Sequence, residues 1–96
     1  MRKYNTESLA DVLRRYLREE GVETPLNEHR LISAWEEVVG SAIARYPTSL
    51  FIRNQVLHVH LSSSVLRQEL MMTRKILVRR LNEKVGAQVI VDIEFR

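Results

Sequence analysis

The sequence contains no cysteine and no long hydrophobic run. Without thiols the chain cannot form disulfides, use a thiolate nucleophile or build a cysteine-based zinc site. No apolar run approaches the roughly 20 residues that a membrane-spanning helix needs, so we expect no membrane partner. These absences together predict a domain of the reducing cytoplasm.

Side chains arranged for catalysis are also scarce. The three glycines stand far apart, so no glycine-rich loop could hold a phosphate. His58 and His60 lie two residues apart on a predicted strand and so point to one side. Asp92 and Glu94 could complete a metal site with them. Zinc, however, requires three or four closely placed ligands. We therefore interpret the two histidines as polar residues on the solvent-exposed face of the sheet. We therefore expect no enzyme, no metal or other cofactor and no small-molecule substrate.

Hydrophobic periodicity divides the 96 residues into one domain, 1–96, that begins with a loose end at 1–5. Thr6 is the expected N-cap of the first helix, and Gly21 is expected to stop it. Thr24 and Pro25 are expected to start the second helix as N-cap and first helical residue. The predicted elements are helices over 6–20, 25–39 and 64–85, a short helical turn over 41–46, and strands over 49–53, 56–61 and 88–95.

This order predicts an α+β fold, α-α-β-β-α-β, with a three-stranded mixed sheet. Asn54 and Gln55 separate the first two strands and indicate a tight hairpin turn. A helix joins the second strand to the third, which makes these two strands parallel. The helices should cover chiefly one face of the sheet. Whether the third strand lies beside the first or the second is left open.

Apolar stripes predict which side of each element is buried. Trp35 lies within the stripe of the second helix and is expected to anchor the core. The stripe of the first helix comprises Leu9, Val12, Leu13, Tyr16 and Leu17. The stripe of the second comprises Leu31, Ile32, Trp35, Val38 and Val39. The stripe of the long helix comprises Leu66, Leu70, Thr73, Leu77 and Leu81, and the buried face of the last strand comprises Val89, Val91, Ile93 and Phe95.

Charge is distributed unevenly along the chain. Residues 1–37 carry six basic and eight acidic side chains, a net −2, whereas residues 38–96 carry nine basic and four acidic ones, a net +5. Such an excess favours a polyanionic or acidic partner. We expect a nucleic-acid contact from the cations of the long helix: Arg67, Arg74, Lys75, Arg79, Arg80 and Lys84. Apolar side chains on the same outer side, Met71, Met72 and Val78, suggest a protein partner as well.

Several segments carry a family resemblance. The sequence Trp35-Glu-Glu-Val-Val-Gly40 is followed by Ala42-Ile-Ala44 and Pro47. The later segments are Leu57-His-Val-His-Leu61, Ser62–Ser64 leading into Gln68-Glu-Leu70, the stretch from Leu77 to Asn82, and Val91-Asp-Ile-Glu-Phe-Arg96. In this order and spacing they resemble the DciA-type family of bacterial replicative-helicase loaders, over nearly the whole chain from Leu9 onward.

The resemblance implies a KH-like domain that binds the replicative helicase and has some affinity for DNA. The segment 64–85 contains no glycine, so the GXXG loop with which KH domains clamp nucleic acid is missing. We therefore expect a non-enzymatic module that contacts the helicase and assists its loading during replication initiation, with weak, non-specific DNA binding. The alternative is a stand-alone, non-specific nucleic-acid-binding domain, for DNA or RNA, that uses the basic helix face.

Overall fold

The computed structural model describes residues 8–19 and 23–96, with side chains described over 8–16 and 24–96. The predictions for residues 1–5, Thr6 and Gly21 lie outside the described residues, as does the side chain of Leu17. The elements in chain order are α1 (Leu9–Glu19), α2 (Glu23–Ser33), α3 (Trp35–Val39), α4 (Ser41–Ala44), β1 (Ser49–Arg53), β2 (Val56–His60), α5 (Ser64–Met72), α6 (Arg74–Val85) and β3 (Asp92–Phe95).

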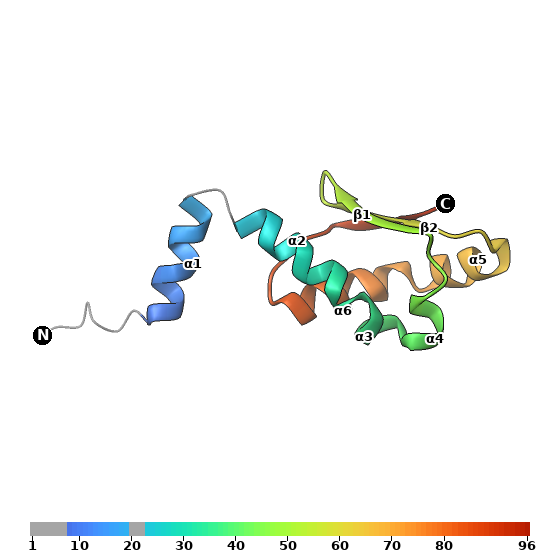
Figure 1. Cartoon of the computed structure of the whole chain (residues 1–96), viewed down its shortest axis with the longest axis horizontal. Helices are drawn as coiled ribbons and strands as arrows, with labels where there is room; N and C mark the ends of the chain where they lie inside the picture. Colours follow the sequence, from blue (N-terminus) through green and yellow to red (C-terminus); the bar gives the residue numbers. More distant parts are fainter. Residues whose placement is uncertain (1–7, 20–22) are drawn as a thin grey trace, which may run out of the picture.

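The three strands form one mixed sheet in the order β1-β2-β3 (Figure 1). β1 pairs antiparallel with β2, and β2 pairs parallel with β3, as the sequence predicts. The third strand therefore lies beside the second and not beside the first, a choice that the sequence leaves open. In the β1–β2 turn both Asn54 and Gln55 have positive φ, 52° and 64°, as a two-residue hairpin turn requires.

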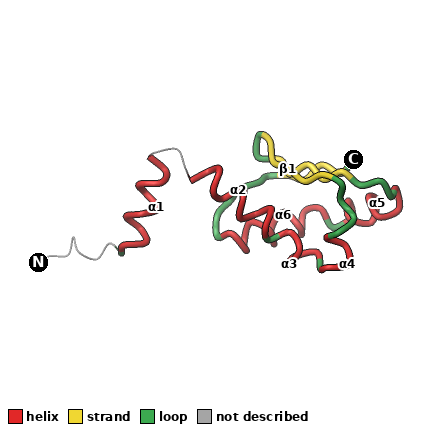
Figure 2. Tube along the Cα trace, viewed as in Figure 1, coloured by secondary structure: helices red, strands yellow, loops and turns green. Residues whose placement is uncertain are grey.

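Helices cover one face of the sheet and leave the other open, and α1 stands away from this body (Figures 1 and 2). The predicted layout α-α-β-β-α-β is thus confirmed, whereas the likeness to the KH fold itself stays a prediction. None of the helices in the described part of the chain is long and apolar enough to cross a membrane.

The core lies between the sheet and the helices. Trp35, only 2% exposed, is part of it, so its predicted anchoring role is confirmed. Its stripe neighbours Ile32, Val38 and Val39 are only partly buried and pack around this core. The largest fully buried side chains are Trp35, Leu31, Leu57, Leu61, Leu81, Ile90, Ile93 and Val59.

The predicted long helix over 64–85 is wrong in one respect: it is divided at Thr73 into α5 and α6. Thr73 has φ −108° and ψ 15°, and its hydroxyl donates to the carbonyl of Leu70 at 3.1 Å. Such side-chain bonds compete with helix geometry. The helix resumes at once, since the Leu77 amide donates to the Thr73 carbonyl at 3.0 Å. Thr73 is exposed and leaves the predicted stripe, in which Leu70, Leu77 and Leu81 are buried.

The last strand begins at Asp92 rather than at residue 88. Val89 and Ile90 are both buried, whereas Val91 is 53% exposed, so its place on the predicted buried face is wrong. The cause is Asn82, whose Oδ1 accepts from the amides of Val89 and Ile90 at 2.9 and 3.1 Å while its Nδ2 donates to the Ile90 carbonyl at 2.8 Å. These bonds hold the segment to α6, so period-two alternation starts only with β3.

The second helix also starts earlier than predicted. α2 begins at Glu23, so Thr24 lies inside the helix and the expected N-cap is wrong. Pro25 is tolerated there because the first helical amides need no intrahelical acceptor. The helix is interrupted after Ser33 and resumes as α3, and Gly40, with φ 91°, then allows a bend into α4.

Candidate functional site on helices α5 and α6

Three of the six predicted cations have partners inside the fold. Arg67 donates from Nη1 to the carbonyl of Leu61 at 2.6 Å, which fixes the loop between β2 and α5. Arg74 Nε lies 3.3 Å from Asp92 Oδ1, and its ion pair joins α6 to β3. The third is Lys84, whose Nζ lies 3.1 Å from Glu37 Oε2 on α3. Two of these charges are therefore balanced by acids from distant parts of the sequence.

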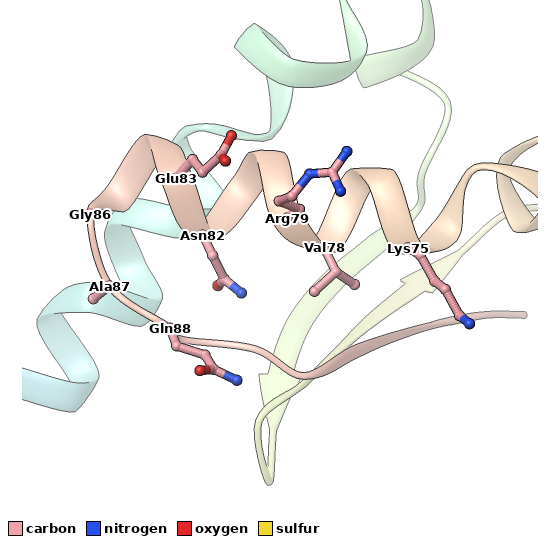
Figure 3. Close-up of a pocket in the computed structure, with 8 residues that line it drawn as sticks. All are labelled: Lys75, Val78, Arg79, Asn82, Glu83, Gly86, Ala87 and Gln88. Carbon is pink, nitrogen blue, oxygen red and sulfur yellow. The ribbon is translucent and has the colours of Figure 1, made fainter.

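The other three cations, Lys75, Arg79 and Arg80, make no ion pair with any residue of the described ranges. Lys75 and Arg79 lie one turn apart on α6 and line a hollow of about 630 Å³ beside the α6–β3 loop (Figure 3). Arg80 lines a neighbouring hollow with Glu37 and Glu83. Three cations without an ion pair thus lie within six successive residues of α6.

The hollow has one apolar wall and one charged rim. Lys75 extends toward the chain that leads into β3, whereas the side chains of Arg79 and Glu83 extend away from it (Figure 3). Glu83 therefore reduces the positive potential around Arg79. Asn82 also lines the hollow, but its amide is engaged by the backbone of Val89 and Ile90, so it holds the fold rather than a ligand.

The predicted partner-binding residues differ in exposure. Met72 is 81% exposed and Met71 51%, whereas Val78 is partly buried against the core and forms the wall of the hollow. Ile76 is 44% exposed, and the sequence reasoning missed it. The sequence signal that could have identified Ile76 is its position: it is an apolar residue outside the buried stripe, four positions after Met72.

These side chains form two rows along the outer side of the helices. Spacing of three to four residues places Met71 next to Lys75, and Met72 next to Ile76 and then Arg79. We call these five residues the α5–α6 surface. It combines large exposed apolar groups with two unpaired cations, a composition typical of contact surfaces.

The open face of the sheet holds the two histidines. His58 stacks on Phe51, with ring centroids 4.7 Å apart, and its Nδ1 lies 2.9 Å from Glu94 Oε1. The Nδ1 of His60 instead lies 2.7 Å from the hydroxyl of Thr48. No group of three or more potential metal ligands occurs among the residues that the structure describes. The geometry therefore gives each histidine its own separate contact.

Comparison with known protein families gives one assignment that covers most of the chain. The family model described as "Dna(CI) antecedent, DciA" matches residues 8–95. A comparison with curated proteins gives no match. The family is associated with loading of the replicative helicase during DNA replication. The match extends from α1 to the end of β3. Because it covers nearly the whole chain, the chain belongs to the DciA family.

Proposed function

We propose that this domain contacts the replicative helicase through the α5–α6 surface and assists its loading on DNA. The observation that carries this proposal is the exposure of three large apolar side chains, Met71, Met72 and Ile76, on two helices whose other side packs into the core. Methionine and arginine are enriched at protein interfaces, and flexible methionine side chains adapt to a partner. Val78 contributes through the adjoining hollow.

The experiment is a titration of the purified domain against the replicative helicase by calorimetry. The double variant Met71→Ala/Met72→Ala should weaken binding by at least about 10-fold, because truncating central apolar contacts costs 1 kcal/mol or more each. Val91→Ala is the matched control, since Val91 is an exposed apolar residue that belongs to neither α5 nor α6. Equal affinity of the double variant and the wild type would contradict the docking site.

A second candidate function is direct, non-specific binding of nucleic acid. It is favoured by Lys75, Arg79 and Arg80, three cations of α6 that make no ion pair with any described residue. Three phosphate contacts predict a log–log salt slope of about −2 on single-stranded DNA, at about −0.7 for each contact. Fluorescence anisotropy of a labelled oligonucleotide across a salt series would measure this slope. A slope near zero would exclude contacts to phosphates.

A further inference from the structure

Helix α1 exposes every apolar stripe residue whose side chain is described, so the predicted burial of this stripe is wrong. Leu9, Val12, Leu13 and Tyr16 follow helical spacing on one side of α1, and they are between 41% and 82% exposed. Figure 1 shows α1 projecting from the end of the body where α2 begins. A helix of 11 residues is marginal in water without tertiary contacts. The stripe therefore needs a surface that covers it.

The body carries an apolar groove at its other end. The groove lies between α4 and α5 and has a volume of about 580 Å³. Ile43, Leu66 and Leu70 form its floor and pack against the core, while Tyr46 and Val65 stand on its rim. Val65 is 71% exposed. Both α4 and α5 lie at the end of the molecule opposite to α1 (Figure 1).

Charge makes the helix and the groove complementary. The charged residue that lines the groove is Glu69, and its other polar linings are hydroxyl groups. On α1, basic residues outnumber acidic ones by three to two, and Arg14, next to Leu13, is paired through Nη1 with Asp11 Oδ1 at 3.1 Å. The stripe from Leu9 to Tyr16 spans about 10 Å at 1.5 Å a residue. An apolar ridge on a helix of net positive charge thus matches an apolar groove with an acidic residue.

We propose that α1 of one copy docks in the α4–α5 groove of a second copy of this chain. Both halves of the interface are then present on one molecule, at opposite ends, where the observed fold does not bring them together. Exchange of the two α1 helices closes a two-fold dimer in which both grooves are filled. This inference does not depend on the helicase contact.

The test is the mass of the whole chain in solution, measured by light scattering and sedimentation over a concentration series. The wild type should reach twice the 11.3 kDa of one chain as the concentration rises. Leu13→Glu on α1 and Val65→Glu on the groove should each weaken the dimer by at least about 30-fold, the size of a hot-spot loss. Both positions are exposed, so folding, checked by circular dichroism, should be unchanged. Val91→Glu is the control and should dimerise like the wild type.

Mixing the two variants identifies which surfaces meet. The Val65→Glu chain retains a normal α1, and the Leu13→Glu chain retains a normal groove, so their mixture should form a heterodimer through one intact contact. If α1 instead pairs with α1, the Val65→Glu chain will dimerise alone, which would overturn the groove assignment. A wild type that stays at 11.3 kDa at all concentrations would overturn the proposal, including the case in which its own α1 folds back.

Discussion

The inner and outer sides of α5 and α6 follow different rules. On the inner side Leu70, Leu77 and Leu81 are buried against the sheet at the spacing of one helical face. On the outer side Met72 and Ile76 are exposed at the same kind of spacing. Helical periodicity alone therefore does not distinguish a residue that stabilises the fold from one that is free to contact a partner. The difference is that the sheet packs against the inner side and no other part of the described chain covers the outer side.

The cations on the outer side make the same point. Arg74 and Lys84 are paired with acids, whereas Arg79 is not, although all three are basic residues of one helix. Their partners, Asp92 and Glu37, come from β3 and α3. The number of basic residues on a predicted helix face is thus only an upper limit on the number of positive charges that remain unpaired after folding.

The largest expected effect comes from the inner side. Trp35→Ala should lower the free energy of unfolding by about 3–5 kcal/mol, as truncation of a buried aromatic residue does. Urea denaturation followed by circular dichroism measures it, because the substitution removes the only tryptophan. Met72→Ala on the outer side should change stability by no more than about 0.5 kcal/mol. A similar loss of stability in both variants would mean that the inner and outer sides contribute equally to folding.

The next effect tests the amide that ties α6 to the segment before β3. Asn82→Ala removes three hydrogen bonds and leaves the amides of Val89 and Ile90 without their acceptor, at a cost of about 1–3 kcal/mol. Gln88→Ala is the control, because Gln88 is an exposed amide on the same loop. Thermal unfolding compares the two. If they melt alike, the Asn82 bonds do not hold the loop.

Local pattern predicts much of this fold. The order of the elements, the hairpin at Asn54 and Gln55, and the parallel third strand follow from period and turn chemistry. The break at Thr73 and the exposure of Val91 do not, because each depends on a side-chain hydrogen bond to the backbone. Periodicity contains no information on such bonds.

The candidate site was predictable only in part. The sequence indicates Lys75, Arg79 and Arg80 as basic residues of one helix, but equally Arg67, which serves the loop before α5. Which cations remain unpaired depends on contacts between elements that lie up to 47 positions apart, as for Lys84 and Glu37. These contacts appear only once α3 is packed against α6.

A smaller effect separates the unpaired cations of α6 from cations elsewhere in the chain. The double variant Arg79→Glu/Arg80→Glu should weaken binding to single-stranded DNA at low salt by at least about 10-fold, through lost phosphate contacts. Arg45→Glu/Arg53→Glu changes the net charge equally but lies outside α5 and α6, so it should have much less effect. Anisotropy titrations at one salt concentration compare them. Equal losses would mean that net charge alone attracts DNA.

The smallest expected effect converts a paired cation into an unpaired one. Glu37→Gln removes the partner of Lys84, and the pair is exposed on both sides, so stability should change by less than about 1 kcal/mol. The released Lys84 lies one turn beyond Arg80 and becomes available to a phosphate. DNA binding should therefore tighten, and the log–log salt slope should become steeper by about 0.7, one additional contact. Glu28→Gln, which removes an acid elsewhere on the helical layer, should leave the slope unchanged. If both variants steepen the slope equally, the local ion pair does not control the availability of Lys84.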